Sequence, residues 1–164
     1  MKIFIMLTLV VSLAACGGDS SSPTAAVASP TSKNIGDPVD VGNFSYVVNN
    51  AKFLKEVGGE LDQKKADGVF LVINVTFRNN DKEEHTLDNS LFKLTDDKGT
   101  EFESSSDGES ALEMAGKETL FAKECNPNIT KSGLLIFEVP HEGTYNLHLS
   151  GGLWNGEEAV VKVP

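Results

Sequence analysis

Hydrophobic and polar positions alternate most clearly at residues 69–77, which read VFLVINVTF. Every second residue from Val69 to Phe77 is apolar, and most of these side chains are β-branched or aromatic. This period of two predicts a β-strand, because successive side chains of a strand point to opposite faces of its sheet. Asn and Asp residues at 79–81 predict the end of the strand, since both suit turn conformations.

Further segments carry strand patterns of the same kind. In residues 134–140, Leu135, Phe137 and Val139 share one face. The short connection at 141–143 predicts a hairpin between this strand and the next one. The other predicted strands are residues 44–57, which we expect to be long and bent, and residues 91–94, 100–102, 145–149 and 158–163.

Two segments between the predicted strands bear on the fold class. Residues 96–99 (Asp-Asp-Lys-Gly) predict a tight turn, with Gly99 at positive φ. Residues 107–116 are the one place where a helix would fit, but we expect a turn or loop there. About seven or eight short strands without a long helical pattern predict an all-β fold, an antiparallel sandwich.

An almost wholly apolar run follows Lys2 at residues 3–15. It is shorter than the roughly 20 residues of a membrane-spanning helix and ends in small residues, which predicts a secretory signal peptide at 1–15. The run ends in Leu13, Ala14, Ala15 and Cys16. This ending resembles the lipobox of bacterial lipoproteins, in which a diacylglycerol is attached to the cysteine and a peptidase cuts just before it.

The lipobox resemblance implies cleavage between Ala15 and Cys16 and a lipid anchor on Cys16. The expected location is the bacterial cell envelope, on the membrane face outside the cytoplasm; an ordinary signal peptide that contains a cysteine is the alternative. Gram-negative lipoproteins with Asp directly after the cysteine stay at the inner membrane. Gly17 stands there, so the resemblance favours the outer membrane in such an organism.

Residues 16–37 have the Ser-, Ala-, Gly- and Pro-rich composition of a flexible linker. As a coil, this segment reaches about 25 Å on average. We therefore expect a lipidated cysteine and linker at 16–37 and one folded domain at 38–164.

The charge balance limits the classes of partner. The 164-residue chain has 24 acidic and 14 basic residues, a formal net charge of -10. Loss of Lys2 with the signal peptide would leave 24 acids and 13 bases, or -11. Nucleic-acid affinity depends on Lys and Arg that displace counterions, so we expect no nucleic-acid partner.

The order of the motifs resembles a known family. Gly68 precedes the long strand, which ends at Asn79; the segment LFKLTDDKG follows, and then NPNITKSGLLIFEVP. This order is similar to that of the domain-of-unknown-function 4352 family, extracytoplasmic immunoglobulin-like sandwiches found on bacterial lipoproteins. The resemblance implies that fold and location, and it implies no catalytic residues. Asn128 departs from the pattern, because the family often has glycine after Pro127.

Few residues of the sequence have the spacing of a catalytic or metal-binding site. If Cys16 is acylated, Cys125 is the only thiol left and has no partner in the chain. We therefore expect a small buried side chain, with a reactive thiol or pairing between two chains as the alternatives. His85, His141 and His148 lack the spacing of metal ligands, and we expect no metal site and no cofactor. We also expect no catalysis, since no nucleophile motif or phosphate-binding loop is present.

Two segments remain as candidates for ligand binding. The acidic residues 96–109 do not fit a calcium-binding loop, so we expect a hairpin turn and a solvated loop there, with weak calcium binding as the alternative. Trp154 and Tyr145 are candidate ligand contacts, although aromatic rings of sandwiches commonly lie in the core.

Two hypotheses about function follow. In the first, the protein is a membrane-anchored binding module for an envelope protein or wall polymer, with inhibition of a cationic envelope enzyme as a narrower version. In the second, it is a receptor for a small ligand or sugar, with Trp154 as a stacking platform.

The lipid anchor can be tested directly. Cells that express the protein should incorporate radiolabelled palmitate into it, and Cys16→Ala should remove the label because the acyl-bearing thioether cannot form. The label is measured after immunoprecipitation. Equal labelling of the Cys16→Ala variant would contradict lipidation at this residue.

Overall fold

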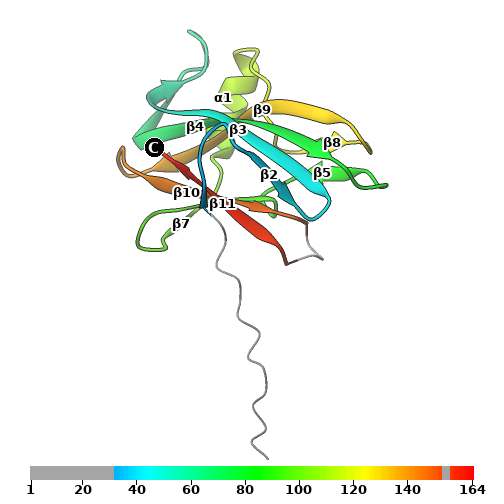
Figure 1. Cartoon of the computed structure of the whole chain (residues 1–164). Coiled ribbons are helices and arrows are strands. Elements are labelled where there is room, and N and C mark those ends of the chain that lie inside the picture. The colour runs from blue at the N-terminus through cyan, green and yellow to red at the C-terminus, as the bar shows by residue number, and fades with distance from the viewer. Residues whose placement is uncertain (1–31, 153–155) are drawn as a thin grey trace, which may run out of the picture.

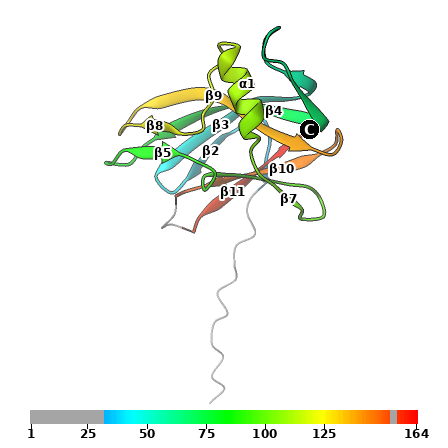
Figure 2. The same cartoon turned by 180° about the vertical axis from the view of Figure 1, so that it is seen from behind.

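The chain folds as two stacked β-sheets, and one short helix lies on the outer face of one of them (Figures 1 and 2). This computed structural model describes residues 32–152 and 156–164. Its elements are β1 (Ser32–Lys33), β2 (Pro38–Val41), β3 (Phe44–Val57), β4 (Lys64–Asn79), β5 (His85–Leu87), β6 (Phe92–Thr95), β7 (Glu101–Phe102), α1 (Ser106–Met114), β8 (Lys123–Cys125), β9 (Thr130–Val139), β10 (Tyr145–Ser150) and β11 (Glu158–Val163).

The two large sheets have the strand orders β1-β11-β10-β6-β7 and β2-β3-β4-β9, and β5 and β8 form a separate pair. Paired strands run antiparallel, except that β1 and β11 are parallel. The predicted antiparallel sandwich is therefore confirmed. The strands β1, β2, β5 and β8 are additional to the predicted ones; β1, β5 and β8 have only two or three residues each, too few for a period to be evident.

The space between the large sheets is filled by the side chains that the alternation places on one face. The five apolar residues that alternate from Val69 to Phe77 in β4 are each at most 1% exposed. The Phe77 ring meets Phe44 and Tyr46 of β3, with ring centroids 5.1 and 5.3 Å apart. The predicted inner face of β9 belongs to the same cluster, with Leu135, Phe137 and Val139. Burial of these large apolar side chains is the main stabilising contribution of the sandwich.

The opposite face of β4 is covered by α1. Phe70 and Val72 of β4 and Ile136 of β9 pack under Ala111 and Leu112 of the helix. Because both faces of β4 are covered here, its sequence is a continuous apolar run at residues 69–73.

The helix corrects the expectation of a turn or loop at residues 107–116. Ser105 caps its first turn, where the hydroxyl accepts a hydrogen bond from the Gly108 N–H at 3.2 Å. Asp107 and Glu109 add negative charge to that turn, which favours a helix N-terminus. At Gly108 the helix lies so close to β9 that a Cβ atom would be 2.7 Å from Cδ1 of Ile136. Tertiary packing therefore stabilises a helix too short to be evident from its own pattern.

The connection after β9 also differs from the prediction. β9 pairs with β4, whereas β10 pairs with β6 and β11 in the other sheet, so the segment crosses between sheets instead of closing a hairpin. Pro140 provides no backbone N–H directly after β9, which limits further pairing. Tyr145 anchors the crossing, because its hydroxyl donates to the His141 carbonyl at 2.7 Å while the residue is 1% exposed.

Two local backbone predictions are confirmed. The long strand β3 has register shifts against β4 after Val48 and after Leu54, which bend it. In the turn between β6 and β7, Gly99 has a φ of 82°. The Asp96 carboxylate accepts hydrogen bonds from the N–H groups of Lys98 and Thr100 at 2.9 and 2.7 Å.

The sandwich begins before the predicted boundary at Pro38. Ser32 and Lys33 pair with Val160 and Val161 of β11, so residues 32–37 belong to the folded domain. The predicted signal peptide and the first part of the linker lie outside the described residues. Within the described ranges, no helix has the length and hydropathy needed to cross a membrane.

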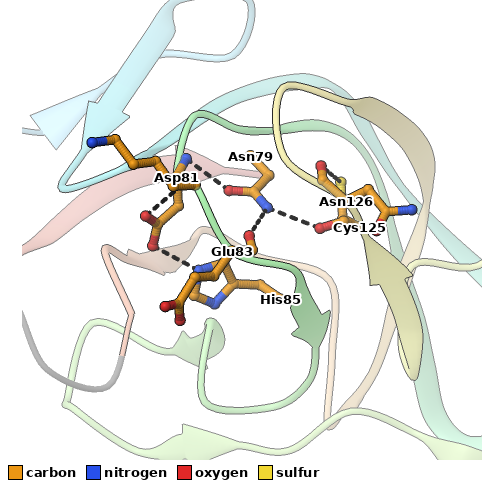
Figure 3. A network of polar contacts seen from close by, with 7 residues as sticks. Asn79, Asp81, Glu83, His85, Cys125 and Asn126 are labelled. Atoms are coloured by element: carbon orange, nitrogen blue, oxygen red, sulfur yellow. Dashed lines mark hydrogen bonds and ion pairs between the residues drawn. The ribbon is translucent and has the colours of Figure 1, made fainter.

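A buried asparagine joins three segments at the end of β4 (Figure 3). The Asn79 amide nitrogen donates to the carbonyl groups of Glu83 and Cys125 at 2.7 and 2.8 Å, and its amide oxygen accepts from the Asp81 N–H at 2.9 Å. The Asn79 carbonyl accepts from the Asn128 N–H at 2.7 Å. The β4–β5 connection and the β8–β9 connection are thereby fixed to one residue.

The turn that carries Asn128 explains why this residue can replace glycine. Asn128 has a φ of 62°, and the Ile129 N–H donates to the Asn126 carbonyl at 3.2 Å across the turn. Asparagine adopts this left-handed conformation more readily than most other residues with a side chain. The turn therefore forms with Pro127 followed by Asn128.

Asn79→Ala should lower the free energy of unfolding by about 3 kcal/mol, because it leaves buried backbone groups without a hydrogen-bond partner. Asn80→Ala is the matched control, since Asn80 is exposed, and it should change the stability by less than about 0.5 kcal/mol. Urea unfolding measures both variants. Equal stability of the two would contradict the structural role of Asn79.

Candidate functional site

A groove of about 550 Å³ runs between α1 and the exposed side chains of β3. Its floor is the outer face of β4 and β9, and its helix-side wall is Leu112 with Lys117 and Glu118, which follow α1. This volume lies within the range of small-molecule sites, roughly 300–1,000 Å³. It would also accommodate a few residues of an extended peptide.

The backbone around α1 forms this wall. Before the helix, the Ser105 N–H donates to the Ile136 carbonyl of β9 at 2.9 Å. After the helix, the Leu134 N–H of β9 donates to the Glu118 carbonyl at 2.9 Å, and the Leu120 N–H donates to the Leu134 carbonyl at 3.1 Å. The segments on both sides of α1 thus pair with the edge of β9, which holds the helix over the sheet and covers part of that edge.

Sheet register divides the groove into a polar and an apolar end. Asn50 of β3 is opposite Asn74 of β4, and Lys52 is opposite Val72. Residues directly opposite each other share a face of the sheet. The amides of Asn50 and Asn74 therefore lie side by side, and Lys52 and the aliphatic Val72 form the next pair along the strands. Leu54, two positions beyond Lys52 on β3, continues the apolar end.

The apolar end is lined by aliphatic side chains. Leu54 packs against the cluster under α1, which includes Val57, Val72 and Leu112. All four residues line the groove. Among the described lining residues none is aromatic, so this end fits an aliphatic group and provides no ring on which a sugar could stack.

The polar end has hydrogen-bond donors available to a ligand. The Asn74 amide oxygen accepts from Asn49 at 2.6 Å, and the Ser132 hydroxyl shares a hydrogen bond with Thr76 at 2.8 Å. The Asn74 amide nitrogen and the Asn50 side chain make no hydrogen bond to another residue in the described ranges. An amide nitrogen is a donor, so these groups suit the carbonyl or carboxylate oxygens of a ligand.

Four charged residues line the groove without an ion pair to another described residue: Lys52, Glu56, Lys117 and Glu118. Glu56 lies near Gly58 at the apolar end, six residues and therefore roughly 20 Å along β3 from Asn50. The pKa of Lys123 is raised mainly by Glu113 and to a smaller extent by Glu118. Part of the field of Glu118 thus acts on Lys123.

Cys125 is buried on β8, as predicted (Figure 3). Its thiol lies 3.5 Å from the Ile129 carbonyl oxygen, and burial raises the pKa of the thiol. A thiol with a raised pKa forms little thiolate at neutral pH, which disfavours the alternative of a reactive cysteine.

The histidines lie in separate places. His85 contacts the Asp81 carboxylate at 2.8 Å and the edge of the Phe44 ring, and its hydrogen bond lowers the pKa of Asp81. His141 lies at the crossing after β9. Among the described residues, no group of three His, Cys, Asp or Glu side chains is placed to hold a metal ion.

His148 forms a chain of contacts that the sequence did not indicate. One ring nitrogen contacts the Glu158 carboxylate, and the other lies 2.9 Å from the Thr95 hydroxyl. An acid–histidine–hydroxyl chain resembles the relay of hydrolases. Thr95 is only 8% exposed, however, so its hydroxyl has little access to a substrate. We assign these contacts to the pairing of β6, β10 and β11.

The other predicted site residues fall into two groups. Tyr145 is 1% exposed and contacts the rings of Phe53 and Phe102, so it belongs to the core and offers no surface to a ligand. Trp154, Ala15 and Cys16 lie outside the described residues.

The acidic segment 96–109 is divided between two structural roles. Asp96 caps the turn before β7, and Asp107 pairs with Lys64 at 2.5 Å beside the helix. The predicted turn is therefore present, but the predicted solvated loop is replaced in part by α1.

The groove residues were missed because they are separated along the chain. β3, β4, the segment 112–118 at and after the end of α1, and β9 each contribute two or more of them. One signal was available: Phe70 and Val72 are apolar on the face of β4 opposite the core, which indicates that another element covers that face. Sequence alone did not identify that element.

Comparisons with known proteins agree on the fold. The yjhA protein of Bacillus subtilis matches with 17% identity and a TM-score of 0.60, over 80% of this chain and 98% of that one. The candidate lipoprotein ycdA of the same species matches with 18% identity and a TM-score of 0.55, over 77% of this chain and 38% of that one. The secreted protein MPT63 of Mycobacterium tuberculosis matches with 14% identity and a TM-score of 0.54, over 83% and 98%.

At these identities the structural matches establish the fold alone. No curated protein matches the sequence. A family model does match, over residues 33–160, and its range begins within β1 and ends within β11. The matched range thus coincides with the observed sandwich. The chain belongs to the family described as the domain of unknown function DUF4352.

Proposed function

We propose that the protein is a lipid-tethered binding module of the bacterial envelope, and that the groove beside α1 holds part of an envelope protein. The groove is the observation that carries this proposal, because it combines unpaired charges and free amide groups with an aliphatic surface. Such a combination of a few polar groups and an apolar lining is typical of binding sites.

The location outside the cytoplasm is part of the proposal. It is supported by the LAAC ending at Cys16 and by the fold shared with a candidate lipoprotein and a secreted protein. From Cys16 to Ser32 the chain advances 16 residues, which span at most about 55 Å when fully extended. An anchor at Cys16 would therefore keep the sandwich near the membrane surface.

The attachment point and the groove lie on opposite sides of the sandwich. Ser32 pairs with β11 in the five-stranded sheet, whereas α1 covers the outer face of the other sheet (Figures 1 and 2). The point where the tether joins the sandwich therefore lies away from the groove, which stays accessible to a partner.

The alternative of a sugar receptor is less well supported. Carbohydrate sites commonly use an aromatic platform, and the described residues of this groove supply none. The narrower version, an inhibitor of a cationic enzyme, rests on the net charge of -10 alone, and a groove lined by two lysines and two glutamates gives it no support.

Photo-crosslinking in living cells tests the proposed site. A photoreactive amino acid in place of Glu56 should give a discrete adduct of higher mass, because Glu56 lines the groove and is not one of the groups to which binding is assigned. The same substitution at Lys162, an exposed residue of β11 on the other sheet, is the matched control and should give none.

Ser132→Arg should suppress the Glu56 adduct, because the longer side chain would fill the polar end of the groove. Thermal unfolding of the purified variant establishes that the domain still folds. Adducts of equal yield from both positions, or no adduct from Glu56, would argue against the groove as the binding site.

A further inference from the structure

We infer that the groove takes an extended peptide segment in which an aliphatic residue and an acidic residue are two positions apart. This inference rests on the proposed function and adds the chemistry of the ligand. Three features of the groove support it: the aliphatic lining, the free amide donors and the unpaired lysines.

The apolar end selects for an aliphatic side chain. Leu54, Val72 and Leu112 surround it, and Leu54 is only partly buried by the packing under α1. Each CH₂ group of a ligand that is buried here strengthens binding about fourfold. A leucine or valine side chain fits this end by chemistry and size.

The polar end suits the backbone of an extended chain. The amide nitrogen of Asn74 and the side chain of Asn50 lie side by side on neighbouring strands and are free to pair with a ligand. An extended peptide presents carbonyl groups along its length, each with two lone pairs that accept hydrogen bonds. Two adjacent amide donors can therefore bind the backbone of the peptide whatever its side chains are.

Charge determines the second side chain of the peptide. Lys52 and Lys117 line the groove with no carboxylate partner among the described residues, although the whole chain has a net charge of -10. Glu56 and Glu118 also line the groove, but Lys52 is the charged residue that lies on β3 between Asn50 and Leu54, the two ends that the peptide contacts, and Glu56 lies beyond Leu54. A carboxylate on the ligand beside Lys52 would pair with it, and a lysine there would be repelled.

Strand geometry sets the spacing. Lys52 and Leu54 point to the same face of β3, two residues and therefore about 6.7 Å apart. Residues two positions apart in an extended peptide have the same separation. A peptide that runs along β3 can thus place an aliphatic side chain beside Leu54 and a carboxylate beside Lys52 simultaneously.

Fluorescence anisotropy with the full chain, purified in detergent, tests the inference. The probe is a fluorescein-labelled peptide amide, Gly-Ser-Leu-Ser-Glu-Gly, which should bind saturably and more weakly as the salt concentration rises. Replacing Glu by Lys, or Leu by Ser, in the peptide should weaken binding about tenfold or more, because each removes one charge-assisted or apolar contact.

Matched variants locate the binding. Lys52→Glu and Lys117→Glu should each weaken binding about tenfold, whereas Lys98→Glu, the same charge change in the turn between β6 and β7, should not alter it. Leu54→Ser should weaken binding, whereas Leu61→Ser should not, since Leu61 is 96% exposed and does not line the groove. Thermal unfolding of each variant verifies the fold.

Two results would overturn the inference. Binding of the Glu→Lys peptide at equal or higher affinity would show that the groove does not prefer an acidic segment. Absence of binding by all peptides, while position 56 still gives its adduct in cells, would reject this ligand chemistry and leave the proposed function standing. Absence of both signals would reject the two proposals together.

Discussion

The structure depends on the burial of β4 on both of its faces. One set of alternate side chains, from Val69 to Phe77, fills the space between the sheets. The other set, Phe70 and Val72, requires a second cover, which α1 supplies. A strand of this kind must be central in its sheet, and β4 lies between β3 and β9. Its position therefore fixes which strands flank it and where the helix must lie.

The groove is a consequence of how α1 covers this sheet. The helix lies over Phe70, Val72 and Ile136, and leaves the row from Asn50 to Asn74 uncovered. The segments on both sides of α1 pair with the edge of β9, so the helix-side wall is held by backbone hydrogen bonds. A short helix with weak intrinsic stability can form a rigid wall when tertiary contacts hold it in this way. The groove therefore does not depend on an additional loop to form its wall.

Buried polar contacts hold the ends of the sandwich. Asn79 joins two connections with its side chain and backbone, and all of its side-chain groups are paired. Tyr145 performs a similar role at the crossing between the sheets. Both residues are buried, and each unpaired polar atom there would be costly. Their polar atoms serve the fold, which leaves the less buried amides of Asn50 and Asn74 as the groups available to a ligand.

The sequence by itself determined the features that depend on neighbours along the chain. Alternation identified β4 and β9, the Asp-rich segment identified the turn at Gly99, and the order of motifs indicated the family. The tertiary structure decided what depends on distant contacts. It placed β9 and β10 in different sheets, and it made residues 106–114 helical because β4 and β9 present an apolar face to Ala111 and Leu112. It also assembled the groove, since no local pattern records that Asn50, Asn74, Lys117 and Ser132 meet at one surface.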